Sequence, residues 1–275
     1  MAAPRAYAKP WCKAVGGKTQ LLPVLLPILQ SQPFHAYHEA FVGGGAVFFA
    51  LRATFQGPCF LADTNEDLMD GWRAVRNQPL MLIHELQKHR ERNCKEYFEE
   101  VRRWAPTSEL DRAARFIYLN KTAFNGLWRV NQKGQMNVPW GKYENPSVCD
   151  AETVHACHAS LKGVHVHTEG FEQSLARVKP GDLVYMDPPY VPVSVTSNFT
   201  GYGKLGFGER DQEDLAGEFR RLDKLGAKCV LSNSDCSWVR ELYEGFNIRS
   251  VSARRNVNSD GKKRGPVAEV VVTNF

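Results

Sequence analysis

Hydrophobic positions along the 275-residue chain alternate between short apolar runs and longer segments with a helical spacing. Short apolar runs bounded by glycine or proline are typical of buried strands, whereas apolar residues three or four positions apart are typical of helices. The predicted strands are residues 35–42, 59–62, 164–168, 183–186, 228–231, 248–251 and 267–273. The predicted helices are residues 46–51 and segments beginning near residues 66, 150, 209 and 238. This order predicts an α/β fold.

The alternation stops between residues 67 and 148, where helical patterns rich in charge replace it. A chain of this length with 43% hydrophobic residues can form one large core and a smaller domain. We therefore expect a main domain formed by residues 1–66 and 149–275, with residues 67–148 inserted into it.

Charge and cysteine content limit the cellular setting without defining it. The net charge of +5 permits a polyanionic partner but does not require one. The seven cysteines form no CxxC pair, and their odd number argues against a disulfide framework. The apolar run 21–29 is too short to cross a membrane and contains two prolines. We expect a soluble cytoplasmic protein without a cleaved leader.

The strongest candidate for chemistry is Asp187-Pro188-Pro189-Tyr190, which directly follows a predicted buried strand. In open α/β sheets, ligands bind at the carboxyl ends of strands. A carboxylate and a backbone carbonyl that accept both hydrogens of a nucleobase amino group would make its nitrogen more nucleophilic. Consecutive prolines stiffen the turn and leave its carbonyls free, and Tyr190 can stack on the base. Alternatively, the prolines merely end the strand.

Two glycine turns and one acidic residue predict a nucleoside-containing cofactor. Gly43 begins a turn of three glycines between a strand and a helix, and Asp63 lies 20 residues later, where a carboxylate can bind ribose hydroxyls. Phe48 replaces the third glycine of the dinucleotide motif, so S-adenosylmethionine fits better than NAD. Asp63 is also a candidate helix N-cap. Lys18 follows an earlier glycine turn that lacks the Walker spacing, and an ordinary loop is the alternative there.

Residues 116–143 are candidates for nucleic-acid recognition. An apolar helical pattern ends at Asn125-Gly126, and the following residues are rich in Arg, Lys, Asn, Gln and aromatic side chains. Such side chains read base edges and insert into base stacks. A polar hairpin around Lys133-Gly134 explains the same composition. The basic connector 254–264 is either a phosphate contact or a solvated hairpin tip.

Two histidine groups do not predict a metal site. His84-Glu85 and His89 resemble a zinc-protease motif, but the five-residue spacing makes the two rings diverge on a helix. His155, Cys157 and His158 lack a second cluster to complete four ligands, and we expect them at the surface.

Taken together, these motifs resemble the Dam-type, alpha-class DNA N6-adenine methyltransferases over nearly the whole chain. The segments that carry the resemblance occur in the family order: Lys13-x-x-Gly-Gly-Lys18, Phe41-Val-Gly-Gly-Gly, Ala62-Asp63-x-Asn65-x-Asp67-Leu68, Tyr118-Leu-Asn, Asn125-Gly-Leu-x-Arg129, Asn137-Val-Pro-x-Gly141, Asp187-Pro-Pro-Tyr190 and Ser197-Asn-Phe-Thr. The resemblance implies a Rossmann-like methyltransferase fold with a seven-stranded mixed sheet. Residues 67–148 would be its mostly helical target-recognition insertion.

The resemblance also implies roles for individual residues. The catalytic set would be Asp187, Pro188, Pro189 and Tyr190. The methyl donor would contact Ala14, Lys18, Phe41, Gly43, Asp63, Phe171 and Asp187. Double-stranded DNA would contact Phe124, Asn125, Leu127, Arg129, Asn137, Pro139, Lys142 and Asn198, with Phe124 inserting into the duplex. Two residues depart from the family: Ala14 replaces an aromatic residue, and Lys142 replaces the arginine of relatives specific for GATC.

We therefore predict methyl transfer from S-adenosylmethionine to N6 of a flipped-out adenine, at GATC or a related short palindrome. The reaction would use no metal and no covalent enzyme intermediate, and the protein would act on DNA as a monomer. One rival is a cytosine-N4 methyltransferase, whose motif more often begins with Ser. Another is a catalytically idle DNA-binding relative, against which the retention of Lys18, Asp63, Asp187 and Tyr190 argues.

Overall fold

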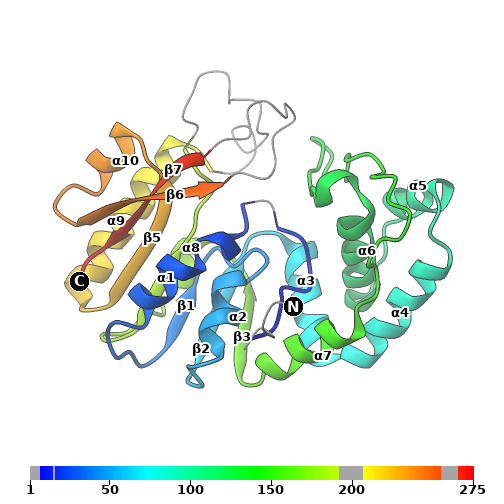
Figure 1. Cartoon of the computed structure of the whole chain (residues 1–275), viewed down its shortest axis with the longest axis horizontal. Coiled ribbons are helices and arrows are strands. Elements are labelled where there is room, and N and C mark those ends of the chain that lie inside the picture. The colour runs from blue at the N-terminus through cyan, green and yellow to red at the C-terminus, as the bar shows by residue number, and fades with distance from the viewer. Residues whose placement is uncertain (1–6, 15, 192–206, 255–265) are drawn as a thin grey trace. The chain divides into compact units, whose positions relative to one another are not determined.

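The protein consists of two compact units in the computed structural model (Figure 1). The structure describes residues 7–14, 16–191, 207–254 and 266–275. The first unit contains Met1–Thr19, Gly43–Gln56 and Asn65–Val166, and the second contains Gln20–Val42, Gly57–Thr64 and His167–Phe275. Each unit is thus assembled from separate stretches of the sequence.

The strands form a seven-stranded sheet with the order β3-β2-β1-β4-β5-β7-β6, and all of it except the first three residues of β3 belongs to the second unit (Figure 1). Strands β2, β1, β4 and β5 are parallel, and β7 runs antiparallel to both β5 and β6. The order 3-2-1-4-5 is that of doubly wound Rossmann-like folds. The predicted α/β class with a mixed seven-stranded sheet is therefore confirmed. The strands are β1 (Tyr37–Glu39), β2 (Cys59–Asp63), β3 (Val164–Thr168), β4 (Leu183–Met186), β5 (Lys228–Ser234), β6 (Asn247–Arg254) and β7 (Pro266–Thr273).

Strand β4 has its predicted length, whereas β1, β5 and β6 (predicted as residues 248–251) differ from theirs. Strand β4 is buried along its whole length, as expected for a strand between two parallel neighbours. Strand β5 continues past the predicted end at residue 231, because Ser232, Asn233 and Ser234 pair with β7. Strand β1 has only three residues instead of the predicted eight.

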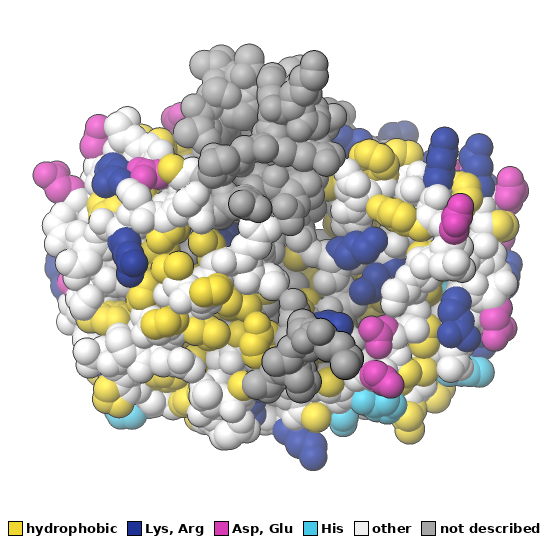
Figure 2. Space-filling view, viewed as in Figure 1, with side chains coloured by type: hydrophobic (Ala, Val, Ile, Leu, Met, Phe, Trp, Pro, Cys, Tyr) yellow, Lys and Arg dark blue, Asp and Glu magenta, His cyan; other side chains and the backbone are white. Residues whose placement is uncertain are grey.

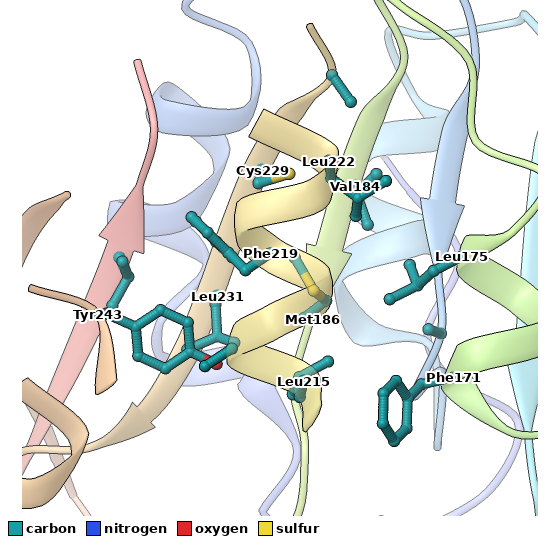
Figure 3. Packing of buried hydrophobic residues seen from close by; sticks show 14 of the residues in the cluster. Phe171, Leu175, Val184, Met186, Leu215, Phe219, Leu222, Cys229, Leu231 and Tyr243 are labelled. Carbon is teal, nitrogen blue, oxygen red and sulfur yellow. The ribbon is translucent and has the colours of Figure 1, made fainter. Parts of the chain in front are cut away.

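Helix α9 (Glu209–Leu225) covers the sheet with one apolar face. Its Leu215, Phe219 and Leu222 are fully buried and pack with Met186 and Leu231 of the central strands (Figure 3). The helix ends at Gly226, whose φ of 85° is left-handed, a conformation that glycine adopts without strain. The other helices of this unit are α1 (Leu22–Leu29), α8 (Phe171–Leu175) and α10 (Ser237–Leu242).

The first unit is mostly helical. Helix α6 lies at its centre, packs against α3, α4 and α5, and is buried along most of its length. The N-cap of α3 is Asn65, whose side chain accepts a hydrogen bond from the Leu68 amide, so the alternative that Asp63 caps this helix is wrong. The helices are α2 (Ala46–Arg52), α3 (Glu66–Asn77), α4 (Pro79–Glu91), α5 (Lys95–Arg103), α6 (Glu109–Thr122) and α7 (Ala151–Ser160), with short 3-10 turns η1 (Lys18–Gln20) and η2 (Phe124–Gly126).

Residues 123–143 form an irregular hairpin after α6. Isolated bridges join Ala123 to Trp140 and Val130 to Met136, and the chain turns between residues 131 and 135. The polar hairpin that the composition allowed is therefore present. Among the helices of the described residues, none is long and apolar enough to cross a membrane.

Candidate active site

The carboxyl ends of β1, β2 and β4 gather three of the predicted site residues in the second unit. Glu39 pairs with Leu61 on one side and with Tyr185 on the other. Two positions after these paired residues come Phe41, Asp63 and Asp187. All three therefore lie at the same level along the carboxyl edge of the sheet. The strand order reverses between β1 and β4, and this is where open α/β sheets bind ligands.

Buried amides and a hydroxyl hold the turn that follows Asp187. Gln212 of α9 donates to the Pro189 carbonyl at 2.8 Å, and its own side-chain oxygen accepts from Asn233 at 3.0 Å. The Asn233 oxygen in turn accepts from the Val191 amide at 3.3 Å. Ser234 donates to the Val191 carbonyl at 2.6 Å. The backbone is therefore anchored on both sides of Tyr190.

The Tyr190 side chain is fixed at its far end. Its hydroxyl donates to Glu269 of β7 at 2.7 Å. Burial raises the pKa of the Tyr190 phenol well above its usual value, and the nearby carboxylates of Asp187 and Glu269 raise it further. The hydroxyl therefore stays protonated and remains a donor.

Further tyrosines line the same face of the sheet. Tyr37 donates to Glu39 at 2.7 Å, and the hydroxyls of Tyr185 and Ser232 lie 2.9 Å apart. Burial, followed by the charge of Asp187, raises the pKa of Tyr185 well above its usual value. The two phenols stay protonated, and their surroundings include the carboxylates of Asp187, Glu39 and Glu269.

Three aromatic rings cluster beside the ends of β1 and β2. Phe41 stacks on Phe171 with centroids 5.8 Å apart, and Phe207 packs on both. The Asp63 carbonyl accepts from the Glu169 amide, which ties the segment before Phe171 to β2. The structure thus brings Phe41 and Phe171 together, and Asp63 lies on the strand beside them.

The glycine turn before α2 belongs to the first unit and is shaped by packing. Gly45 has φ of 69°, and a Cβ there would overlap the Trp72 ring. The Gly43 carbonyl accepts from the Trp72 indole at 3.0 Å. A Cβ on Gly44 would meet the Ala14 methyl at 2.9 Å, so these two predicted segments, Ala14 and the glycine turn, lie in contact.

Lys18 is buried at the start of η1 in the same unit, with only 7% of its surface exposed. Its ammonium donates to the Gly16 carbonyl at 2.9 Å. The charge is therefore held close to its own glycine turn.

The irregular hairpin of the first unit presents several predicted DNA contacts on its surface. The Phe124 ring is 50% exposed although it is large and apolar. Asn125, Arg129, Asn137, Pro139 and Lys142 are also exposed, whereas Leu127 is half-buried. The Arg129 guanidinium donates to the Asn137 side chain at 2.8 Å across the hairpin. Several Lys and Arg side chains are visible over the region that Figure 1 labels α5 and α6 (Figure 2).

Two residues of this hairpin have unusual backbone angles. Asn125 and Lys142 have φ of 54° and 56°, which is uncommon for residues other than glycine. The Asn125 amide donates to the Tyr143 hydroxyl at 3.0 Å, and this bond fixes the turn beside Phe124. The hairpin therefore holds its exposed side chains on a defined backbone.

The groups that hold the site together could not be recognised from the sequence. In the first unit, Asn120 exchanges hydrogen bonds with the backbone of Lys13 and donates to the Gly126 carbonyl. In the second unit these groups are Gln212, Asn233 and Glu269. A single signal existed, because Glu269 is a charged residue within an otherwise apolar strand.

The histidine groups have structural surroundings. His89 is buried and its Nδ1 lies 2.7 Å from the Tyr97 hydroxyl. Cys157 is fully buried, contrary to the expected surface position, and His158 contacts the Arg76 carbonyl. No group of three or more potential metal ligands occurs within residues 7–14, 16–191, 207–254 and 266–275. Asn198 and most of the basic connector lie outside these ranges.

Comparison with known proteins identifies the family. The family model of the D12 class N6 adenine-specific DNA methyltransferases matches residues 15–257. The type II methyltransferase M1.LlaDCHI of Lactococcus lactis subsp. cremoris is 38% identical over 97% of this chain and 95% of its own. The type II methyltransferase M.MjaIII of Methanocaldococcus jannaschii is 41% identical over 97% and 99%. The DNA adenine methylase of Escherichia coli K12 is 34% identical over 85% and 84%.

Among solved structures, TrmN from Thermus thermophilus aligns with 93% of this chain and 48% of its own at 11% identity. The TM-score of 0.41 is too low for this likeness to add to the assignment. The family match covers most of the chain, and the relatives match over nearly their full lengths. The chain therefore belongs to the D12 class N6 adenine-specific DNA methyltransferases, enzymes that use S-adenosylmethionine to methylate adenine in DNA.

Proposed function

We propose that this enzyme methylates N6 of an adenine flipped out of double-stranded DNA, and that Asp187, Pro188, Pro189 and Tyr190 perform the transfer. The observation that carries the proposal is the placement of Asp187 at the end of central strand β4, followed by a turn anchored on α9 and β5. A rigid turn can present a carboxylate, a carbonyl and a ring in one arrangement.

The proposed mechanism follows from those three groups. The Asp187 carboxylate and the Pro188 carbonyl accept the two amino hydrogens, which concentrates the N6 lone pair on the nitrogen. Tyr190 stacks on the extruded base and offsets part of the extrusion cost, which is a few kcal/mol. When bound, S-adenosylmethionine supplies the methyl group and leaves as S-adenosylhomocysteine. The N6 nitrogen gains the methyl carbon and loses one proton, and the Asp187 carboxylate accepts this proton.

Residues of the second unit fit the adenosyl part of the donor. Asp63 offers a carboxylate at the end of β2 for the two ribose hydroxyls, and Phe41 and Phe171 offer apolar ring surface beside it. In the first unit, we propose donor contacts for Ala14, Lys18 and Gly43 on the strength of the motif match. No metal has a role in this mechanism.

We propose that the exposed side chains of the irregular hairpin recognise DNA. Phe124 would fill the gap left by the extruded base, and its exposed apolar ring supports this role. Leu127, Arg129 and Pro139 would read bases, together with Asn125, Asn137, Lys142 and Asn198. The target would be GATC or a related short palindrome. Residues 67–148 would form the recognition insertion, and the enzyme would act as a cytoplasmic monomer.

Methylation of a plasmid by the purified enzyme tests this proposal. Labelled donor is supplied, the plasmid is digested to nucleosides, and label is expected in N6-methyl-2′-deoxyadenosine alone. Sequencing then maps the methylated sites and shows whether they are GATC. Label in N4-methyl-2′-deoxycytidine would favour the rival activity, and an absence of label would favour an idle relative.

The variant Asp187→Ala tests the catalytic assignment. It removes an acceptor of the target amino group and leaves the hairpin of the first unit unchanged. We expect single-turnover methylation to fall by about 100-fold or more while DNA affinity changes little. Asp214→Ala on the exposed surface of α9 is the matched control. A rate for Asp187→Ala within a few-fold of the parent rate would disprove the mechanism.

A further inference from the structure

The hydrogen bond between Tyr190 and Glu269 joins the catalytic turn to a strand that is distant in sequence. Glu269 lies on β7, opposite Ser234 of β5, and only 7% of its surface is exposed. Burying a carboxylate is costly unless hydrogen bonds compensate. Its bond to the Tyr190 hydroxyl is 2.7 Å long and charge-assisted, which makes it stronger than a bond between neutral groups.

Because the backbone around Tyr190 is held in place, the main conformational freedom that remains is in the Tyr190 side chain. Pro188 and Pro189 have fixed φ angles. The Pro189 carbonyl is held by Gln212, and both polar groups of the Val191 backbone are held by Asn233 and Ser234. The orientation of the Tyr190 ring then depends on its side-chain torsions, and the hydrogen bond from its hydroxyl to Glu269 restricts these torsions.

We propose that Glu269 is a positioning residue for methyl transfer, because its carboxylate holds the Tyr190 hydroxyl and fixes the ring that stacks on the target adenine. This inference rests on the stacking role assigned to Tyr190 under the proposed function. Glu269 touches neither the base nor the donor in this role. It acts by reducing the number of ring orientations that a flipped base meets, so a larger fraction of bound bases is aligned for attack.

The electrostatic surroundings are consistent with this role. Tyr190 remains a protonated donor because burial and neighbouring carboxylates raise its pKa. The carboxylate of Glu269 can accept but not donate when ionised. In this hydrogen bond the Tyr190 hydroxyl donates and the Glu269 carboxylate accepts.

Three variants test the proposal on a DNA duplex whose site has been mapped by plasmid methylation. Glu269→Leu removes the acceptor, Glu269→Gln keeps an acceptor of similar size without the charge, and Tyr190→Phe removes the donor but keeps the ring. Single-turnover methylation is measured on the adenine duplex. Base stacking is measured by fluorescence on a duplex with 2-aminopurine at the target position, because the fluorescence of this base depends on what stacks on it.

We expect Glu269→Leu and Tyr190→Phe to slow single-turnover methylation by about tenfold, the scale of one hydrogen bond that matters in the transition state. Both should change the 2-aminopurine fluorescence of the bound duplex. Glu269→Gln should stay within about threefold of the parent. The double variant Glu269→Leu/Tyr190→Phe should be no slower than either single variant, because both remove the same interaction.

A purely structural role for Glu269 predicts a different outcome. Val271→Ala, two residues along β7 and equally buried, is the control for lost sheet stability. It should lower the unfolding temperature without changing the methylation rate or the fluorescence. If Glu269→Leu does not fold, Tyr190→Phe alone decides, since parent-like rate and fluorescence in that variant overturn the proposal.

Two outcomes separate this inference from the proposed function. If Tyr190→Ala is severely impaired while Glu269→Leu and Tyr190→Phe behave as the parent, the stacking role stands and the positioning role of Glu269 is wrong. If Tyr190→Ala itself retains the parent rate, the stacking role is wrong and the inference falls with it. Losses that multiply in the double variant would show that Glu269 acts by another route, which also overturns the proposal.

Discussion

The predicted role of Asp63 depends on its carboxylate alone. Its carboxylate would accept both ribose hydroxyls of the donor, while its backbone carbonyl already accepts from the Glu169 amide. Asp63→Ala removes the carboxylate and leaves this backbone carbonyl in place. We expect donor binding to weaken by about 1.5–3 kcal/mol, the scale of hydrogen bonds to charged groups. Calorimetric titration with S-adenosylmethionine measures this change.

Two further results complete the Asp63 test. Asp63→Asn keeps an acceptor and should lose less affinity than Asp63→Ala. DNA affinity should be the same in the parent and in both variants. Unchanged donor affinity in Asp63→Ala would remove this residue from the binding site.

Lys142 offers a residue-scale test of sequence specificity. Arginine presents two parallel donors to guanine, whereas a lysine ammonium is a flexible point charge that serves a base edge or a phosphate. We expect Lys142→Ala to cost about 1–3 kcal/mol on the cognate site and to relax preference at one base position. Since alanine shares the unfavourable positive φ of Lys142, the change isolates the loss of the side chain.

Methylation rates on the cognate site and its single-base variants measure the role of Lys142. Lys133→Ala removes the same charge from the exposed turn of the same hairpin and serves as the control. Equal losses on every sequence, with a salt slope lower by about one, would identify Lys142 as a phosphate contact instead.

At the scale of elements, the packing of α3 on α6 depends on a buried carboxylate. Asp70 of α3 is fully buried and binds Arg73 of its own helix and Arg112 of α6, the latter at 2.5 Å. Removing one member of a buried ion pair leaves charges without compensation. We expect Asp70→Ala to lower the free energy of unfolding by about 3 kcal/mol, as measured by urea denaturation.

The comparison variant for Asp70 is Glu100→Ala on α5. Glu100 pairs with Arg92 at 3.4 Å, and both side chains are more than half exposed, so its loss should cost less than about 1 kcal/mol. Equal effects of the two changes would mean that the Asp70 cluster does not join these helices energetically.

At the scale of the whole molecule, one buried histidine makes stability depend on pH. Burial lowers the pKa of His89 to about 4, whereas an unfolded histidine has a pKa of about 6.5. The unfolded chain therefore binds the proton more strongly, and protonation favours unfolding. The contribution of neutral His89 is fully present above pH 6.5 and is lost progressively as the pH falls towards 4. The free energy of unfolding lost through His89 over this pH range is about 3 kcal/mol in total.

The variant His89→Gln does not titrate, so its stability should fall less than that of the parent between pH 7 and pH 4.5. Other groups contribute equally to both proteins and cancel in the difference. Exposed His155→Gln is the control and should follow the parent. Tryptophan fluorescence reports the unfolding of the first unit, which contains Trp11, Trp72, Trp104, Trp128 and Trp140. Parallel curves for parent and His89→Gln would contradict the assignment.

The sequence by itself determined the fold class, the family and several local elements. The predicted strand 164–168 is β3, and the helix predicted from residue 209 is α9, because period and bounding residues are local properties of the chain. The same holds for Asp187 at the end of β4, since an apolar run followed by two prolines has few other conformations. Local patterns also allowed a hairpin at residues 123–143, where the hydrogen-bonded bridges formed.

Only the tertiary structure decided which distant residues support that strand end. Asn233 and Glu269 reach the turn that follows Asp187 because β5 pairs with β4 on one side and with β7 on the other. Strand pairing is selected by packing over long separations in sequence, and no local period encodes it. The burial of polar Ser232, Asn233 and Ser234 extended β5 beyond its apolar run for the same reason. Their hydrogen-bond partners lie on β4, on α9 and in the turn after Tyr190, and these groups come together only in the folded chain.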